Sequence, residues 1–418
     1  MRAVPEMTDR SPRKRLWWLI VVCAFCSLVP RPSPLATAAA AQVESHDGLP
    51  ILYLSGTPYE LGRQHGEALR TEVRASVGQV LGYFRSYLKI PWVRSFVVNW
   101  WLDDAWRQAR PFIPSDDLEE LRGLSDGSGV PLRELCRLHA IPDRTYSCAS
   151  FAAWGPATAG GGLVHLRNLD WNIHAGIQRF AVVFVVRPSG KHAFINIGWA
   201  GFIGVLTGVN DAQLSIGQIG AETVDATFRG EPMGFLIRRI LEDAGDLEAA
   251  AALVGAATRT VGVNYVLADA NARRAMVLET TKRHVRQFEA DDPAEHAVPY
   301  ARPMADAVFR ADTAMDPVIR DRQLASDGEP SRPGLEPPGG SAYEIRYLGQ
   351  AAGLHAHFGR LDVPGAIEIA RAIAPPSNVQ SVIFAWPEMW VANAQGATPA
   401  AGTAYHHLNA KKLLEGSP

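Results

Sequence analysis

The chain has 418 residues, enough for one large domain or two ordinary ones, and a composition of 47% hydrophobic and 20% charged residues typical of a folded globular protein. Its formal net charge is −2, and no basic run occurs beyond residue 20. Binding to a nucleic-acid backbone needs a clustered basic face, so we expect no nucleic-acid partner.

The N-terminal residues have the pattern of a secretory signal peptide. Basic residues 13–15 precede an uncharged apolar stretch at 16–29, and small residues follow at 36–42. The apolar stretch is shorter than the roughly 20 residues of a membrane-spanning helix. We therefore expect a cleaved leader over residues 1–41, export to the periplasm or outside the cell, and no stable membrane span afterwards. An uncleaved N-terminal anchor is the alternative.

The four cysteines divide between the leader and the remaining chain. Cys23 and Cys26 leave with the leader, so the mature chain keeps Cys136 and Cys148. An exported protein could join these two in a disulfide, which would block any chemistry of Cys148. A single disulfide cannot stabilise a chain of this length by itself, so the fold must depend on its hydrophobic core.

The segment 42–147 reads as mainly helical after a short strand at residues 51–54. Thr57 is a predicted helix cap, with Pro58 in the first turn and Glu60 shortly after. Helical periodicity continues to about residue 140. The chain has eleven tryptophans, several of them at residues 92–106, which could line a substrate pocket or simply form core.

From residue 148 the chain changes to short β-branched and aromatic runs separated by tight turns, which predict successive strands. Four later segments are expected to be a helix, a hairpin, a second helix and a second hairpin, at residues 233–254, 263–280, 363–374 and 378–394. Residues 291–341 are rich in Pro, Gly and charge and predict a loop. Helices followed by strands and more helices favour α+β layering.

Cys148 is the candidate nucleophile. A thiol reacts as thiolate, so a base must take its proton, and the motifs of papain-like or caspase-like enzymes are absent. If the bond after Ser147 were cut, the α-amine of Cys148, with a pKa of roughly 7.7–8.0, could be that base. The alternative is a buried structural cysteine.

The residues after Cys148 strengthen the catalytic interpretation. They form a predicted hairpin ending in "RNLD", residues 167–170, which returns Arg167 and Asp170 to the neighbourhood of Cys148. A carboxylate there can hold a protonated amine, and an arginine can lower a thiol pKa. An ordinary surface Arg–Asp pair is the alternative.

Four stretches of this chain resemble the cysteine N-terminal-nucleophile hydrolases. The resemblance is to the autoproteolytic C45 family typified by the fungal isopenicillin-N acyltransferase, and more distantly to bile-salt hydrolases and penicillin V acylases. The most specific stretch is "SCASFAAWGPATAGGGLVHLRNLDW", residues 147–171. Residues 56–70, 264–279 and 378–394 are similar to the family's first helix and later hairpins.

The resemblance implies a four-layer αββα sandwich and self-cleavage between Ser147 and Cys148. The upstream segment 42–147 would stay bound to the catalytic region 148–418 as a separate subunit. Cys148 would attack an N-acyl amide or thioester of a small molecule and form an acyl-enzyme, with Asp170 and Arg167 orienting its amine. Water would give hydrolysis and an amine would give acyl transfer. No cofactor is implied.

The oxyanion donor is less clearly marked. The resemblance implies a catalytic Asn264 and a donor side chain at Gln218, while Asn210 matches a turn position of the family and is a further substrate-site candidate. Relatives commonly carry Thr-Asn shortly after the strand that ends near residue 280. Here Glu295 and His296 stand in that region, and an ionised carboxylate cannot donate to an oxyanion.

Two other function classes are alternatives for this sequence. A metal hydrolase needs three or four converging ligands, and the chain has neither a zinc-binding helix motif nor paired cysteines, so no metal is expected. A non-catalytic exported binding or scaffold protein that keeps the fold is the remaining rival, and it predicts a chain that stays intact before Cys148.

Overall fold

A computed structural model describes residues 41–86, 91–141, 147–324 and 344–416. The predicted leader, with Cys23 and Cys26, lies outside these residues except for Ala41. The strands are β1 (Gln42–His46), β2 (Leu49–Gly56), β3 (Ser147–Gly155), β4 (Gly161–Asp170), β5 (Ala181–Pro188), β6 (Phe194–Trp199), β7 (Thr207–Asn210), β8 (Leu214–Gly220), β9 (Val263–Asp269), β10 (Arg274–Thr280), β11 (Val285–Phe288), β12 (Ala307–Arg310), β13 (Asn378–Ala385), β14 (Glu388–Asn393) and β15 (His406–Asn409).

The α-helices fall into an upstream group and a group interleaved with the strands. They are α2 (Pro58–Ala68), α3 (Arg70–Ser86), α4 (Pro91–Ala109), α5 (Ser115–Ser128), α6 (Leu132–His139), α7 (Met233–Asp243), α8 (Leu247–Ala256), α9 (Pro293–His296), α10 (Pro317–Arg320), α12 (Gly349–His357), α13 (Val363–Ile373) and α14 (Ala410–Glu415). Within the described residues, none of the helices combines the length and apolar character needed to cross a bilayer.

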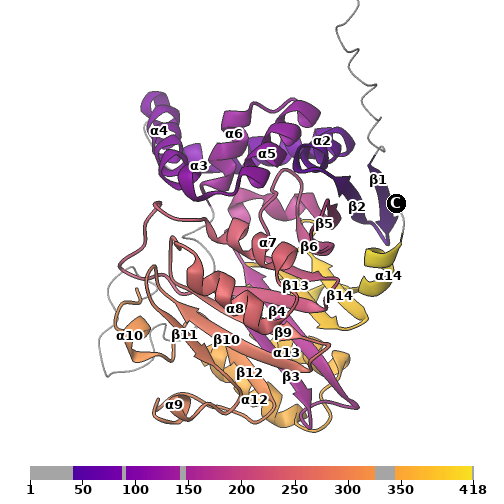
Figure 1. The fold of residues 1–418 in the computed structure, drawn as a ribbon, viewed down its shortest axis with the longest axis vertical. Helices are drawn as coiled ribbons and strands as arrows, with labels where there is room; N and C mark the ends of the chain where they lie inside the picture. Colours follow the sequence, from indigo (N-terminus) through magenta and orange to yellow (C-terminus); the bar gives the residue numbers. More distant parts are fainter. Residues whose placement is uncertain (1–40, 87–90, 142–146, 325–343, 417–418) are drawn as a thin grey trace, which may run out of the picture. The chain divides into compact units, whose positions relative to one another are not determined.

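The strands form two sheets that pack face to face. One sheet has nine strands in the order β1-β2-β5-β6-β7-β8-β9-β10-β11, and the other has six in the order β12-β3-β4-β13-β14-β15. Strands β3 and β4 of the smaller sheet contact β8 and β9 of the larger one, while α7 and α8 cover the outer face of the larger sheet and α13 that of the smaller (Figure 1). The expected four layers, α, β, β and α, are confirmed.

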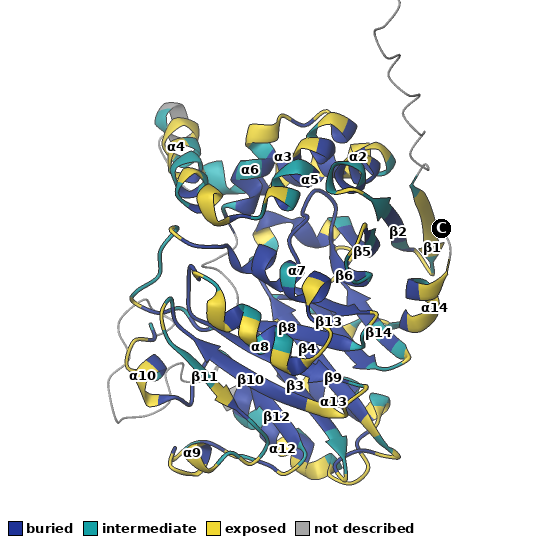
Figure 2. Cartoon of the chain, viewed as in Figure 1, coloured by how far each residue is buried: buried dark blue, intermediate teal, exposed yellow. Residues whose placement is uncertain are grey.

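The central strands are buried on both faces, as their sequences require. Every residue of β9 is buried, and β4 is buried from Leu163 to Asp170 (Figure 2). Strands buried on both faces have nearly continuous apolar runs, so the polar residues among them stand out. In β4 those polar residues include Arg167 and Asp170, which sit inside the molecule rather than at its surface.

The upstream segment is helical as expected, but it also supplies part of the larger sheet. Strand β2 pairs in parallel with β5 of the downstream region, from Ile51 opposite Val183 to Gly56 opposite Pro188. Thr57 caps α2 and forms a reciprocal capping box with Glu60, as the sequence predicted. The upstream and downstream segments therefore share one sheet.

Two predicted elements differ from the structure. The single helix expected over residues 233–254 is two helices, because the Asp246 side chain accepts from the Ala249 N–H and begins α8 anew. The part of the loop expected over residues 291–341 that the structure describes, up to residue 324, contains α9, β12 and α10, and β12 pairs with β3 at the edge of the smaller sheet. Residues 325–341 of that prediction lie outside the described residues. A four-residue strand among turn residues gives too short a pattern to recognise, and its pairing partner lies far away in sequence.

Helices α2 and α5 pack with their backbones in contact. A Cβ added at Gly62 would lie 1.9 Å from the Glu120 carbonyl oxygen, and one at Gly123 would lie 2.0 Å from the Tyr59 carbonyl oxygen. Side chains cannot occupy such positions, so the glycines set the separation of the two helices. By contrast, Gly78 in α3 is exposed and has nothing within 4 Å of its added Cβ.

We expect Gly62→Ala to lower the free energy of unfolding by about 2 kcal/mol or more, because the new methyl group must push the two helices apart. Gly78→Ala is the matched control and should raise it by about 0.5–1 kcal/mol, since alanine is the better helix former. Equilibrium urea unfolding of both variants measures the difference. Equal effects of the two substitutions would contradict the close packing of α2 on α5.

Candidate active site

The pairing of β3 with β4 determines which side chains surround Cys148. The strands are antiparallel, with Cys148 opposite Leu169 and Ser150 opposite Arg167. Opposite residues share a face of the sheet, and so do residues two apart in a strand. Cys148 and Arg167 therefore lie on the same face, toward the larger sheet. The predicted return of the hairpin to its own start is confirmed.

The Cys148 thiol is fully buried. Gln218 of β8 places its Nε2 4.0 Å from the sulfur. Burial raises the pKa of the thiol to about 11, whereas the Arg167 charge and a hydrogen bond from the Asp170 backbone N–H act to lower it. In the intact chain the thiol is therefore protonated at neutral pH. Cys136 is also a free thiol, so the two cysteines form no disulfide.

Asp170 ends β4 beside Cys148. Its Oδ1 accepts a hydrogen bond of 3.1 Å from Asn378 Nδ2, and Arg346 Nε lies 3.6 Å from its Oδ2. Burial raises the pKa of Asp170 to about 7, against the lowering effects of the Arg346 charge and the Asn378 hydrogen bond. The carboxyl group can thus change its protonation state near neutral pH.

Arg167 is a buried guanidinium with unused donors. Its Nη1 donates to the Asn168 carbonyl oxygen, while Nε and Nη2 make no hydrogen bond to any described residue. A buried N–H without an acceptor is costly, so these two groups are available to an acceptor that enters the space between the sheets. The Arg167 side chain lies in the space between the sheets, where its charge acts on the Cys148 thiol.

Asp312 and Arg346 complete the cluster and were not found from the sequence. The Cys148 backbone N–H donates a 2.9 Å hydrogen bond to Asp312 Oδ1, and Arg346 Nη1 donates to Asp312 Oδ2. Asp312 follows β12, inside the segment predicted to be a loop, and Arg346 follows the Pro- and Gly-rich run. Neither had a neighbouring motif. Asn378 begins a recognised hairpin, and its polar side chain at the start of an apolar strand was an available signal.

The two amide candidates for the oxyanion hole lie in different positions around Cys148. Gln218 points its Nε2 at the sulfur, and its Oε1 has no hydrogen-bond partner among the described residues. Asn264 donates from Nδ2 to the carbonyl oxygens of Ala311 and Thr313, at 3.1 and 3.3 Å. These carbonyls flank Asp312. Asn264 thus holds the Asp312 segment.

Two other sequence candidates are not brought to the cluster. Asn210 donates to the carbonyls of Leu241 and Ala244 and accepts from the Leu214 N–H, so its amide secures the turn between β7 and β8 against α7. Glu295 is buried and paired with Arg310 Nη2, and exposed His296 pairs with Asp291. Neither region supplies a donor to Cys148. Among the residues that the structure describes, no three or more His, Cys, Asp or Glu side chains are grouped so that they could hold a metal ion.

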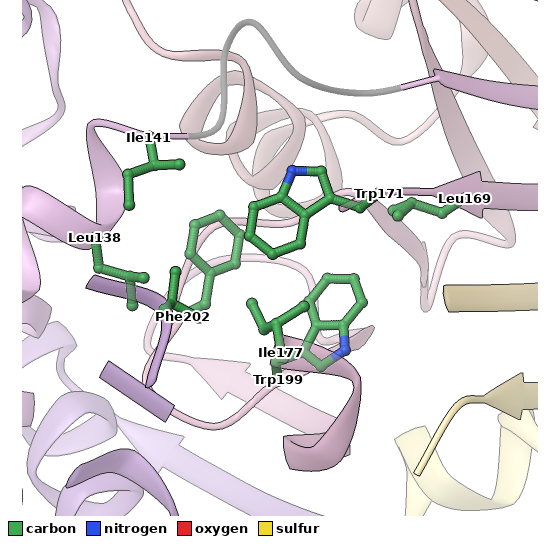
Figure 3. Close-up of a pocket in the computed structure, with 8 residues that line it drawn as sticks. Leu138, Ile141, Leu169, Trp171, Ile177, Trp199 and Phe202 are labelled. Atoms are coloured by element: carbon green, nitrogen blue, oxygen red, sulfur yellow. The ribbon is translucent and has the colours of Figure 1, made fainter. Parts of the chain in front are cut away.

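An apolar cavity adjoins the cluster. Leu169, the cross-strand neighbour of Cys148, contributes to its wall, and Trp171 and Trp199 face into it (Figure 3). The full lining is Val80, Leu138, Ile141, Leu169, Trp171, Ile177, Trp199 and Phe202. Trp100, Trp101 and Trp106 are not among these residues, and Trp100 and Trp101 are 62% and 43% exposed. Of the eleven tryptophans of the chain, Trp171 and Trp199 therefore line the cavity.

Two upstream histidines hold one wall of this cavity. Gly201 N–H donates to His65 Nε2 at 3.1 Å and Ile203 N–H donates to His139 Nε2 at 3.0 Å, on either side of Phe202. Both imidazoles accept at Nε2 and are therefore neutral. Burial lowers the pKa of His65 to about 3 and that of His139 to about 4.

These histidines predict a loss of stability in acid. The unfolded chain protonates histidine near pH 6.5, whereas the folded His139 takes up a proton only at about pH 4. The unfolded state therefore binds more protons as the pH falls from about 6.5 to 4, and stability decreases over that window. His139→Gln keeps an acceptor for Ile203 without a titrating group. Urea unfolding at several pH values should show that the free energy of unfolding falls less steeply with decreasing pH in His139→Gln than in the wild type. The control, exposed His296→Gln, should show the same decrease as the wild type. Parallel curves for all three would refute this.

Comparisons with known proteins found a family model and several relatives that match parts of the chain. Residues 157–298 match the family model described as acyl-coenzyme A:6-aminopenicillanic acid acyl-transferase. The chain is 28% identical over 262 residues to protein dcd1B of Dictyostelium discoideum, covering 58% of this chain and 52% of that protein. It is 24% identical over 215 residues to the N-acylethanolamine-hydrolyzing acid amidase of Oryctolagus cuniculus, covering 49% and 56%.

A solved structure is also similar in part. It is the Caenorhabditis elegans ortholog of N-acylethanolamine-hydrolyzing acid amidase, with a TM-score of 0.42 and 14% identity over 61% of this chain and 95% of that one. The alignments with the dcd1B protein and the rabbit amidase span about half the length of those relatives, at 52% and 56%.

Proposed function

Because the chain belongs to the acyl-coenzyme A:6-aminopenicillanic acid acyl-transferase family, we propose that it is an acyl-amide hydrolase or acyltransferase whose nucleophile is Cys148. One observation carries the proposal. The β3–β4 register gathers a buried thiol, a buried arginine with unused donors and a carboxyl group with a pKa near 7 beside an apolar cavity. A cysteine that merely filled core would need no such surroundings.

The nucleophile becomes active when the chain is cut between Ser147 and Cys148. In the intact chain, burial holds the thiol pKa at about 11, and the Cys148 nitrogen is an amide that cannot act as a base. Cleavage turns that nitrogen into an α-amine with an ordinary pKa of roughly 7.7–8.0, on the same residue as the thiol. The amine then takes the thiol proton, and the thiolate attacks the substrate carbonyl.

The residues around Cys148 have separate roles in this scheme. Gln218 Nε2 faces the sulfur and is the side chain best suited to donate to the oxyanion that forms beside it. Arg167 stabilises negative charge on the sulfur with its buried guanidinium. Asp170, held by Asn378, steadies Arg346 at the far side of the cluster. Collapse of the tetrahedral intermediate expels the amine and leaves an acyl thioester on Cys148.

The substrate is an N-acyl small molecule with an apolar acyl group. The cavity beside Leu169 is lined by aliphatic and aromatic side chains, which favour a hydrocarbon chain over a polar one. Water releases the acyl group in hydrolysis and a second amine does so in acyl transfer. Both reactions begin with the same step, the transfer of the acyl group to Cys148, and the site is suited to that step.

The scheme predicts a chain break before Cys148. Intact mass spectrometry of the purified protein should show two fragments, the second beginning with Cys148. Cys148→Ala should remain intact, because the attacking sulfur is gone, while Cys136→Ala should split like the wild type. An unbroken wild-type chain would favour the non-catalytic binding protein, and a broken Cys148→Ala chain would point to an external protease.

The acyl pocket predicts a length-dependent defect. Ile177→Trp adds bulk to the cavity and should lower kcat/KM by about tenfold or more for long acyl chains, with a much smaller effect on acetyl amides. Ile173→Trp, in the same connection but outside the cavity lining, is the control. Steady-state kinetics on N-acyl amides of increasing chain length test this. An equal loss at every chain length would exclude the cavity as the acyl site.

A further inference from the structure

The hydrogen bond between the Cys148 nitrogen and Asp312 joins a charged side chain to the bond that is to be cut. The Cys148 N–H donates to Asp312 Oδ1 at 2.9 Å, within the 2.6–3.2 Å range typical of catalytic proton-transfer contacts. The nitrogen in this contact belongs to the peptide bond after Ser147. We propose that Asp312 anchors the Cys148 nitrogen in both states of the protein, stabilising it as the leaving group of self-cleavage and then as the α-amine of the processed enzyme.

The register of the smaller sheet brings Asp312 to this position. Strand β12 pairs with β3, with Arg310 opposite Ser150. Asp312 is two residues after Arg310, and in an antiparallel pair that step leads toward the start of β3 and comes level with Cys148. The contact therefore follows from strand pairing at the sheet edge.

Neighbouring side chains fix the Asp312 segment from three directions. Asn264 Nδ2 binds the carbonyl oxygens of the residues on either side of Asp312. Gln323 Nε2 donates to the Asp312 carbonyl oxygen, and Arg346 Nη1 donates to Oδ2. With its backbone and its second oxygen held, the carboxylate keeps Oδ1 directed at the Cys148 nitrogen. A group fixed in this way needs little reorganisation during reaction.

The cleavage step requires a partner for the nitrogen. The Cys148 sulfur forms a bond to the Ser147 carbonyl carbon, the carbon–nitrogen bond breaks, and the thiol proton ends on the nitrogen. The product is a thioester and an α-amine, and water then hydrolyses the thioester to the Ser147 carboxylate and the Cys148 thiol. Positive charge grows on the nitrogen as it leaves, and a carboxylate at hydrogen-bond distance stabilises that charge.

The same contact serves the processed enzyme. An α-amine that donates one N–H to Asp312 Oδ1 is fixed in orientation, with its lone pair free to take the thiol proton. The carboxylate also favours the ammonium form and so raises the pKa of the amine. Asp170 does not make this contact, because its Oδ1 accepts from Asn378 and its Oδ2 faces Arg346. The inference rests on the proposed function and adds a residue that the sequence did not indicate.

The test compares self-cleavage and catalysis in Asp312→Asn, Asp312→Glu and Asp321→Asn. Asp321→Asn removes an exposed carboxylate from the same segment and should behave as the wild type. Asp312→Asn should slow self-cleavage about 10- to 100-fold, the range expected for loss of one charge-assisted hydrogen bond. In its processed fraction kcat should fall more than KM rises, and the acid limb of the pH–rate profile should move to lower pH. A residue with only a structural role would not move that limb.

The outcomes separate this inference from the proposed function. A wild-type chain that never splits would overturn both. If the wild type splits and Asp312→Asn has the same cleavage rate and the same pH–rate profile, only the role of Asp312 is overturned. Thermal melting reports whether Asp312→Asn is folded. If it is not, Asp312→Glu decides, because it keeps the charge for Arg346 but displaces the oxygen from the nitrogen. We expect it to cleave several-fold more slowly, and cleavage at the wild-type rate would overturn the inference.

Discussion

The antiparallel pairing of β3 with β4 sets the other distances in the candidate site. A shift of one residue along β3 would turn Cys148 away from the larger sheet, and the same shift along β4 would turn Arg167 away from it. The opposing sheet is adapted to this register. A Cβ added at Gly217 of β8 would lie 2.7 Å from Arg167 Cδ and 2.8 Å from Ser150 Oγ. Because Gly217 has no side chain, the Arg167 guanidinium can lie between the sheets. The next residue of β8, Gln218, reaches the Cys148 sulfur.

The interior around Cys148 departs from the usual rule that buried polar groups are paired. In the part of the chain that the structure describes, Arg167 Nε and Nη2, Asp170 Oδ2, Gln218 Oε1 and Asn264 Oδ1 lack hydrogen-bond partners. Each such group costs stability, and proteins usually tolerate that cost where a ligand or a reaction intermediate will use the group. Their gathering around one thiol, rather than their individual presence, supports a catalytic role for this region.

The upstream segment contributes to the site although it carries none of the proposed reactive groups. His65 and His139 hold the backbone on both sides of Phe202 in the cavity wall. Arg238 of α7 pairs with Glu120 of α5 at 2.6 Å, and both side chains are buried. Strand β2 adds backbone hydrogen bonds to β5. These contacts cross the proposed cleavage point without depending on the covalent chain, so a cut before Cys148 would leave the cavity wall supported.

Local sequence patterns determined much of this protein. The apolar runs predicted the strands, the Thr57 capping pattern predicted the start of α2, and the hairpin after Cys148 brought Arg167 and Asp170 to the thiol. Each of these features depends on residues that are close together in the chain. Asp312 reaches the same site through the pairing of a four-residue edge strand, and Arg346 reaches it from a short π-helix, Glu344–Leu348, after a Pro- and Gly-rich run. The position of Asn264 beneath Asp312 likewise depends on how strands from distant parts of the sequence stack. Only the tertiary structure decided these contacts, because hydrogen bonds between segments far apart in sequence leave no periodic pattern in either one.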